Sequence, residues 1–317
     1  MVPNRNKVYF GFSVDSAESQ DIASTARRIE ECGYHFLSCG EHLYRGPGYP
    51  GHHWAVTALA IAAGATQKVR LVASTVIAPL RHPALLAKET AFLDEASGGR
   101  LILGVGIGGD FPDEFHALGI PVKERGSRTD EMLDILRRLW TEERVTFHGR
   151  HYTVQDLTIL PRPAQHPHPP IWIGGRQEAA MRRALRYGNG WYPYMYSPRR
   201  YQESVQRVTE LASEIGRDLT DFHWGISLHT CVHPSSRHAM EIGSEWILAR
   251  YRLPDDPEGL LRRAALVGSP DEIAARVQEY LEAGVRYFNF LCACAAEYVP
   301  RNLELVTEQV VATVGAG

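Results

Sequence analysis

The stretch LILGVGIGGDFPDEF, residues 101–115, decides how the rest of this sequence is interpreted. An apolar run leads into Gly104-x-Gly106-x-x-Gly109, the glycine spacing that binds a dinucleotide where a strand turns into a helix. Such a fingerprint normally follows the first strand of its domain and opens a helix at its last glycine. Whether it does so here depends on where the stretch lies in the chain.

Short apolar runs alternate with amphipathic segments along the whole chain. The apolar runs predict strands at residues 8–14, 34–39, 69–77, 101–107, 171–173, 190–194, 224–232 and 286–291. Helical periodicity predicts helices at residues 21–32, 54–63, 83–96, 129–140, 178–187, 198–215, 238–251, 271–283 and 299–314. Eight apolar strands separated by helices favour an α/β fold, a single-domain (β/α)8 or TIM barrel over residues 1–317. An open doubly wound sheet is the alternative.

The glycine-rich stretch follows the fourth predicted strand, and the next predicted helix begins only at residue 129. This context excludes the dinucleotide fingerprint. In a barrel, the carboxyl ends of the strands carry the chemistry. Gly104, Gly106, Gly108 and Gly109 remove side chains at that end, which favours a flat, bulky ligand lying against the backbone. A bulge or a turn that needs positive φ is the other explanation.

One segment, residues 141–170, breaks the alternation of strands and helices. Its sequence predicts a hairpin that turns at residues 148–150, followed by a proline-rich linker. Because about 30 residues are too many for a plain connection, we expect an insertion between strands four and five that lies over the barrel mouth. His166 and His168 lack a neighbouring acidic ligand, so they do not predict a metal site.

The composition is that of an ordinary globular protein, with 317 residues, 44% of them hydrophobic, and a formal net charge of −3. Lysine and arginine are scattered, which argues against binding to nucleic acid or to a membrane surface. No apolar run approaches the roughly 18–20 residues that span a bilayer, and the N-terminus does not resemble a signal peptide. The five cysteines include no C-x-x-C pair. We expect a cytoplasmic protein.

Three segments carry a resemblance to a known family: residues 74–109 (STVIAPLRHPALLAKETAFLDEASGGRLILGVGIGG), 114–131 (EFHALGIPVKERGSRTDE) and 169–194. They resemble the bacterial luciferase-like monooxygenases, whose (β/α)8 barrels bind reduced FMN or the deazaflavin coenzyme F-420. The resemblance covers most of the chain. It implies an oxidoreductase that acts on a small organic substrate, with a flavin reductase as a partner that supplies the reduced cofactor, and a homodimer.

The resemblance also implies where the cofactor binds. The third strand is similar to one that ends in a non-proline cis peptide under the flavin ring, here Thr75–Val76 or else Ser74–Thr75. Gly174-Gly175-Arg176 precedes a helix, and free N–H groups with a guanidinium form a seat for phosphate. The implied cofactor-binding residues are Ser74, Thr75, Val76, Gly106, Gly108, Gly109, Asp110, Gly174, Gly175, Arg176 and Trp191. For Arg176 the alternative is pairing with a neighbouring carboxylate, and for Trp191 it is a core position.

The segment after the second strand, Gly40-Glu41-His42, is similar to the acidic–histidine pair of many members. The resemblance implies that His42 handles a proton near the flavin, and that Glu41 orients His42 or hydrogen-bonds the ring. A surface pair with Arg45 is the alternative. Sugar-phosphate dehydrogenases of the deazaflavin branch carry a glutamate where Gly109 stands here, which disfavours that activity unless Asp110 substitutes.

The sequence therefore favours an enzyme that uses reduced FMN and O2 to oxygenate a small organic substrate. Hydride transfer with coenzyme F-420 is the alternative. The remaining classes are a metal-dependent barrel hydrolase and a flavin-binding protein without turnover. The first strand ends in Gly11-Phe12-Ser13-Val14 instead of the H-x-H pair of such hydrolases, so we predict no metal-binding residue.

Overall fold

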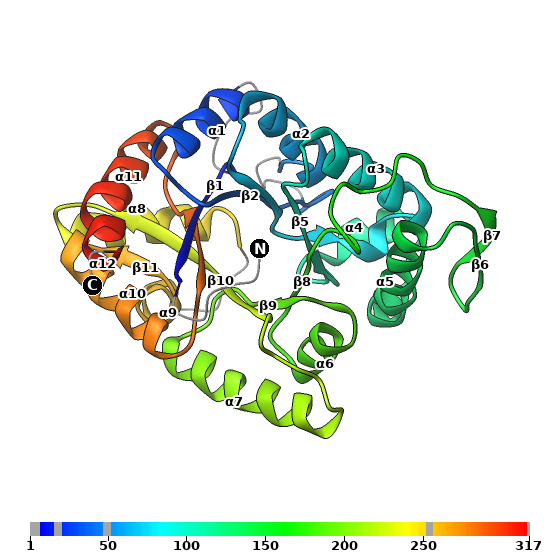
Figure 1. Cartoon of the computed structure of the whole chain (residues 1–317). Coiled ribbons are helices and arrows are strands. Elements are labelled where there is room, and N and C mark those ends of the chain that lie inside the picture. The colour runs from blue at the N-terminus through cyan, green and yellow to red at the C-terminus, as the bar shows by residue number, and fades with distance from the viewer. Residues whose placement is uncertain (1–6, 16–20, 47–51, 252–255, 316–317) are drawn as a thin grey trace.

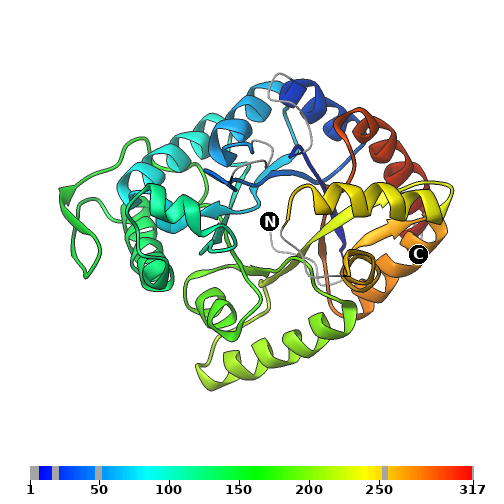
Figure 2. The same ribbon diagram turned by 180° about the vertical axis from the view of Figure 1, so that it is seen from behind.

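The structure is a computed structural model that describes residues 7–15, 21–46, 52–251 and 256–315. A ring of parallel strands enclosed by helices forms its centre (Figures 1 and 2). In ring order the strands are β1 (Tyr9–Ser13), β2 (Phe36–Cys39), β3 (Arg70–Ala73), β5 (Leu101–Gly106), β8 (Ile171–Gly174), β9 (Gly190–Tyr192), β10 (His223–Val232) and β12 (Tyr287–Cys292). The sheet closes because β1 pairs with both β2 and β12, and β10 with both β9 and β12. The predicted (β/α)8 barrel is confirmed, and the open sheet is excluded.

The outer ring of helices also follows the prediction. Its main members are α1 (Ile22–Glu31), α2 (Ala55–Ala65), α3 (Pro83–Ala96), α5 (Arg125–Thr141), α6 (Glu178–Tyr187), α7 (Pro198–Glu214), α8 (Ser236–Leu248) and α10 (Pro270–Glu282). The predicted C-terminal helix consists of α11 (Val299–Leu305), a π-helical turn (Val306–Val311) and α12 (Ala312–Gly315). Within the described part of the chain, no helix is long and apolar enough to cross a membrane.

Some short elements and one boundary differ from the prediction. The sequence does not predict β4 (Val76–Ile77) as a separate strand, nor α4 (Pro112–Ala117), α9 (Pro257–Ala264) and β11 (Leu266–Gly268), which pairs with the end of β10. These elements have two to eight residues, too few to show a clear period. Helix α5 begins at Arg125 instead of residue 129, because its first turn is polar and partly exposed and therefore lacks the apolar periodicity.

Mainly aromatic side chains fill the interior of the barrel, below its mouth at the carboxyl ends of the strands. The inward-facing set is Phe36, Val72, Ile102, Trp172, Tyr192 and Tyr287. Gly11 makes room for this packing, since a Cβ there would lie 2.1 Å from the Phe36 ring. Trp172 Nε1 donates to His223 Nδ1 (2.8 Å), which satisfies the buried indole. The barrel interior is therefore a packed core, and in barrels of this kind ligands bind at the carboxyl ends of the strands.

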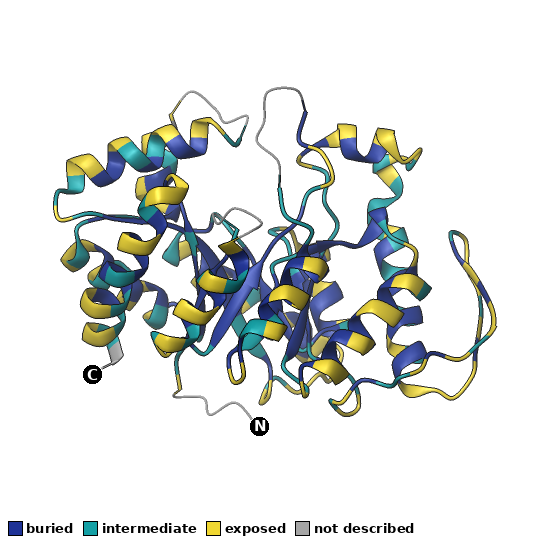
Figure 3. Ribbon diagram, turned by 90° about the horizontal axis from the view of Figure 1, so that it is seen from above, coloured by how far each residue is buried: buried dark blue, intermediate teal, exposed yellow. Residues whose placement is uncertain are grey.

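The predicted hairpin exists as β6 (Val145–His148) and β7 (Thr153–Leu157), but it lies outside the ring of helices (Figures 1 and 3). Glu131 of α5 explains this position. Its carboxylate accepts the N–H groups of Arg150 (2.8 Å), His151 (2.9 Å) and Tyr152 (3.1 Å) at the hairpin turn. The hairpin is thereby held against the outer side of α5.

The linker after the hairpin reaches the amino-terminal rim of the barrel. Gln165 Nε2 donates to Asp94 Oδ1 (2.7 Å) and to the carbonyl of Leu101 (2.7 Å), and Gln165 Oε1 accepts from Arg70 Nη2 (2.8 Å). Arg70 and Leu101 begin β3 and β5, at the end opposite to the mouth. We expected the insertion at residues 141–170 to lie over the barrel mouth, and this expectation is wrong. Its polar contacts bind it to α5 and to the amino-terminal rim of the barrel.

The third barrel strand contains a bulge between β3 and β4. Val72 pairs with Ile102 and Val76 pairs with Val105. Between these two pairs the third barrel strand advances by four residues, whereas β5 advances by three. One extra residue is thus accommodated, as in a β-bulge. The cis peptide bond lies within this bulge at Ser74–Thr75. Of the two predicted positions this one is confirmed, and Thr75–Val76 is wrong.

The glycines of the opening stretch make space for that bulge. A Cβ at Gly104 would lie 2.0 Å from the carbonyl oxygen of Ala73, and a Cβ at Gly106 would lie 2.5 Å from Thr75 Oγ1. At Gly174, on the other side, a Cβ would lie 3.0 Å from Thr75 Cγ2. Contacts within the chain are therefore sufficient to explain these glycines. Because the glycines have no side chains, the floor of the barrel mouth is formed by backbone at these positions.

The later glycines of the stretch serve the turn from β5 into α4. Gly108 has φ +61° and Gly109 has φ +111°, a region that favours glycine. A Cβ at Gly108 would also lie 2.6 Å from Ile77 Cγ2. This close turn places Phe115 of α4 in a buried cluster with Ile77 and Leu80. The helix is thereby anchored beside the end of β4.

We expect Gly104→Ala to destabilise the fold, because the added methyl group would collide with the Ala73 carbonyl. The free energy of unfolding, measured with urea, should fall by about 2 kcal/mol or more. Gly64→Ala is the control, since Gly64 lies in α2 with nothing within 4 Å of an added Cβ. It should raise the free energy of unfolding by about 0.5–1 kcal/mol. Equal effects of the two changes would contradict the bulge explanation.

Candidate active site

Polar side chains from several strand ends form a layer above the aromatic interior. Ser38 Oγ donates to Asn289 Oδ1 (2.8 Å), and Asn289 Nδ2 donates to Ser227 Oγ (3.1 Å). Ser74 Oγ lies 3.1 Å from the hydroxyl of Tyr192. Burial raises the pKa of Tyr192, so its phenol stays protonated at neutral pH. This layer is the floor of the barrel mouth and can donate and accept hydrogen bonds.

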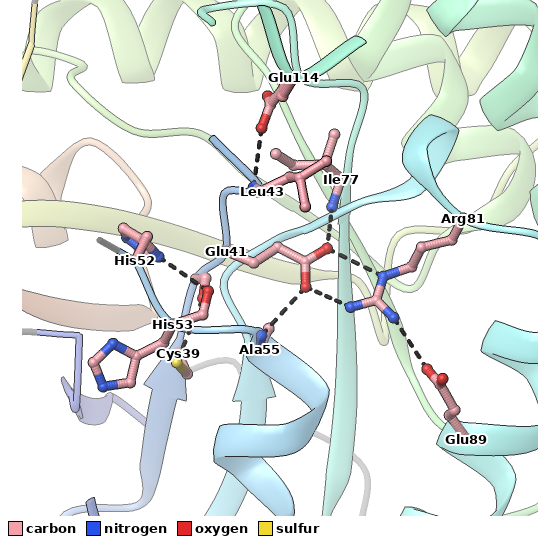
Figure 4. A network of polar contacts seen from close by, with 11 residues as sticks. Cys39, Glu41, Leu43, His52, His53, Ala55, Ile77, Arg81, Glu89 and Glu114 are labelled. Carbon is pink, nitrogen blue, oxygen red and sulfur yellow. Dashed lines mark hydrogen bonds and ion pairs between the residues drawn. The ribbon is translucent and has the colours of Figure 1, made fainter. Parts of the chain in front are cut away.

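Glu41 is buried at the end of β2 in an ion-pair network (Figure 4). Its Oε1 accepts from the N–H of Ile77 (2.9 Å) and from Arg81 Nε (3.2 Å), and its Oε2 from Arg81 Nη2 (2.6 Å) and the N–H of Ala55 (3.2 Å). Four donors thus engage the carboxylate, which joins the first turn of α2 to β4. Within the described residues Glu41 makes no hydrogen bond to His42, so it does not orient that ring as expected.

Glu114 of α4 takes the position next to His42. Its Oε2 lies 3.4 Å from His42 Nδ1 and accepts the N–H of Leu43 (3.2 Å). The ring of His42 packs edge-on against Phe111 (4.8 Å between centroids) and His52 (5.4 Å). Glu114 is not among the site residues predicted from the sequence. It begins one of the segments that carry the family resemblance, but no local spacing shows that α4 folds back onto the loop after β2.

The predicted cofactor residues Asp110, Gly175 and Arg176 meet at the rim of the mouth. The Tyr194 hydroxyl donates to Asp110 Oδ2, and the Arg176 guanidinium lies 4.9 Å from the centroid of the Tyr194 ring. Burial, together with the Asp110 charge, raises the pKa of Tyr194. Gly175 has φ +132° just before α6, whose N-cap Gln177 makes no side-chain cap. The first N–H groups of α6 are therefore not capped by a side chain, and the described residues supply no carboxylate to Arg176.

Two other predicted cofactor residues face the core between sheet and helices. Trp191 is fully buried, donates from Nε1 to the Gly175 carbonyl (3.0 Å) and packs against Tyr201 (5.3 Å between centroids). The side chain of Val76 is in the same core. Successive strand residues point to opposite faces, so Tyr192 and not Trp191 points into the barrel. Trp191 therefore has the core position that the sequence left open as its alternative, whereas the prediction for Val76 concerned its peptide bond and not its side chain.

Arg45 is a buried cation at the mouth and not part of a surface pair with Glu41 or His42. Its guanidinium lies 5.5 Å from the ring centroid of Phe111 and 5.7 Å from that of Tyr251, and its Nε has no acceptor among the described residues. Burial, with the Arg45 charge as a second cause, lowers the pKa of His229 to about 4. Burial likewise lowers the pKa of His52 to about 4. Both imidazoles are therefore neutral at pH 7.

The family model of the luciferase-like monooxygenases matches residues 10–287. The chain belongs to this family. A curated relative is the FMNH2-dependent dimethylsulfone monooxygenase of Pseudomonas putida, 33% identical over 197 residues, which are 60% of this chain and 53% of that protein. The chain spans about half the length of the curated relatives it matches (53% and 47% for two of them).

Solved structures of similar fold cover nearly the whole chain. Monooxygenase RslO1 from Streptomyces bottropensis has a TM-score of 0.81 and 27% identity, with 96% of this chain and 99% of that chain covered. An F420-dependent secondary alcohol dehydrogenase has a TM-score of 0.84 and 21% identity, with 97% and 99% covered. The second likeness concerns the fold alone. Over the described residues, no three His, Cys, Asp or Glu side chains gather as ligands for a metal ion.

The Glu41–Arg81 pair should matter mainly for stability. Glu41→Ala leaves two buried backbone N–H groups without an acceptor and leaves the buried Arg81 with only its exposed partner Glu89. We expect the free energy of unfolding in urea to fall by about 3–5 kcal/mol. Glu89→Ala removes only the exposed partner of Arg81 and should cost at most about 1 kcal/mol. Similar losses for both variants would show that burial of the pair is unimportant.

The neutral His229 should make stability depend on pH. Its pKa of about 4 in the folded chain lies below the ordinary 6.5, so the unfolded chain binds the extra proton as the pH falls from 6.5 to 4. The contribution of the neutral His229 to the free energy of unfolding is complete above pH 6.5 and is lost towards pH 4. Relative to His229→Gln, the unchanged protein should lose about 3 kcal/mol of unfolding free energy between pH 7 and pH 4.

Proposed function

We propose that this chain is a flavin-dependent monooxygenase that uses reduced FMN and O2 to oxygenate a small organic substrate. The observation that carries this proposal is the similarity to the FMNH2-dependent dimethylsulfone monooxygenase. The oxidoreductase class agrees with the family of the chain. The arrangement of polar and cationic groups at the mouth supports the same function.

The residues at the mouth fit an FMN group in two respects. The low floor around Thr75, Gly104 and Gly106 offers a surface on which a tricyclic ring lies without meeting a large side chain. Arg176 and the uncapped first turn of α6 would hold the phosphate, since a guanidinium and free N–H groups favour that anion. Bound reduced FMN supplies the two electrons that reduce one oxygen atom of O2 to water while the other enters the substrate.

The chain itself would position the substrate, exclude water and move a proton. Phe111 and Tyr251 line the side of the mouth near Arg45 and keep it apolar. His42, which is only partly exposed, is placed to accept or donate a proton there. A dry site is needed because water promotes side reactions that would consume the reduced cofactor and O2 without oxygenating the substrate.

Hydride transfer with coenzyme F-420 is the second candidate. A chain of similar fold is an F420-dependent secondary alcohol dehydrogenase, which is why this coenzyme is tested beside FMN. The anionic tail of that coenzyme would require cations at the rim. Arg81 is paired with Glu41 and Glu89, and Arg128 with Glu124, whereas Arg45 and Arg176 have no ion pair among the described residues. The preference for FMN therefore rests on the similarity to the FMNH2-dependent relative.

A small organic substrate and a flavin reductase that supplies reduced FMN are the partners this proposal requires. The homodimer stays a prediction. Ile61 on α2 and Leu85 and Phe92 on α3 are large apolar side chains with 43%, 65% and 57% exposure, and they offer an apolar surface for such an association.

Cofactor binding tests the proposal directly. The purified chain should bind reduced FMN more tightly than riboflavin, and Arg176→Gln should weaken FMN binding about 10-fold while riboflavin binding is unchanged. Arg182→Gln, a change on the exposed side of α6, is the control. With a reductase and dimethyl sulfone or related small compounds, labelled oxygen from ¹⁸O2 should enter a product. Tight binding of coenzyme F-420 without uptake of FMN would refute the proposal.

A further inference from the structure

We propose that Glu114 is the positioning residue of this site, which holds His42 as its Nδ1–H tautomer and leaves Nε2 free to act at the mouth. The use of His42 in turnover rests on the proposed function. The tautomer itself does not, since it follows from contacts within the protein.

The chemistry of the two facing atoms determines the tautomer. Glu114 Oε2 lies 3.4 Å from His42 Nδ1, and the side chain of Glu114 has 0% exposure. An ionised carboxylate can only accept hydrogen bonds, so the ring nitrogen that faces it must carry the hydrogen. A neutral His42 then has its lone pair on Nε2, for which the described residues provide no hydrogen-bond partner. That nitrogen is left to accept a proton from a ligand.

Glu114 is buried with few hydrogen bonds of its own, and its charge acts on the buried Arg45 as well as on the ring of His42. The N–H of Leu43 is one neutral donor at 3.2 Å, and Glu114 Oε1 has no partner among the described residues. Burying a carboxylate with one neutral donor is costly unless a further donor or a cation compensates. Glu41, the residue before His42, shows the contrast, because four N–H donors engage its carboxylate. The incomplete bonding of Glu114 indicates a site that interacts with His42 and with a ligand or its proton.

The fold holds Glu114 rigidly in this place. Gly108 turns the chain sharply after β5, and Pro112 begins α4 at its first position. The next residue after Glu114, Phe115, is fully buried against Ile77 and Leu80. The carboxylate therefore approaches His42 from a helix that is anchored on its opposite side, as a positioning group requires.

The consequence for the reaction is a directed proton transfer. His42 Nε2 takes a proton from the reacting group, and the imidazolium that forms carries its charge beside the carboxylate of Glu114. Without Glu114, the ring is free to expose either nitrogen and the charge is no longer compensated. The proton step then slows, whereas binding of the cofactor and substrate changes little.

The tautomer is measured on the cofactor-free protein by NMR with ¹⁵N-labelled histidine. Comparison with His42→Gln identifies the signal of His42 among the 14 histidines. We expect Nδ1 to carry the hydrogen in the native protein and in Asp113→Asn, an exposed change on the same short helix. In Glu114→Met, which keeps the length but removes the acceptor, we expect the hydrogen to be shared between the two nitrogens. Glu114→Gln retains an acceptor and should lie between these two.

Turnover is then compared in the same variants, with a folded state verified by circular dichroism. Glu114→Met should lower kcat about 10-fold to 100-fold, with KM within about threefold, and Asp113→Asn should leave both unchanged. An Nε2–H tautomer in the native protein, or an unchanged tautomer and kcat in Glu114→Met, would overturn the inference. If the native protein shows the Nδ1–H tautomer but no oxygenase activity, the proposed function fails and the positioning role stands.

Discussion

The close approach of the third barrel strand to its neighbours is the constraint on which the rest of the site depends. At one point a backbone carbonyl, that of Ala73, occupies the volume that a side chain at position 104 would need. Glycine is the residue that permits this contact, and the bulge, the low floor and the polar layer with Ser74 follow from it. The same stretch then turns through Gly108 and delivers α4 to the mouth. One run of small residues thus shapes both the floor and one wall.

Two buried carboxylates lie close to the second strand, and their surroundings give them different roles. Glu41 has the Arg81 guanidinium and the backbone N–H groups of Ala55 and Ile77 as donors. Its carboxylate thereby joins the end of β2 to α2 and β4. Glu114 has one backbone N–H and a histidine, and one of its oxygens has no partner among the described residues. A fully bonded carboxylate stabilises a fold, whereas a partly bonded one remains able to act on its neighbour.

The predictions that differ from the structure concern residues whose direction, or segments whose path, depends on distant contacts. Trp191 and Tyr192 are adjacent aromatic residues, and the strand's alternation sends only the second into the barrel. The register that decides this is set by pairing with β8 and β10, which no local pattern shows. The insertion follows the same rule, because Glu131 and Gln165 determine its path.

The sequence by itself determined the barrel, its strands and main helices, and the family, because apolar periodicity and the glycine, proline and charged motifs are local properties. It also placed His42 and Arg176 just after strand ends, where parallel strands converge, and their roles stay predictions. Only the tertiary structure decided that Glu114, 72 residues away in sequence, and not the adjacent Glu41, lies beside His42. The physical reason is that a carboxylate's role depends on the donors that surround it, and these donors come from elements that meet only after the sheet has closed.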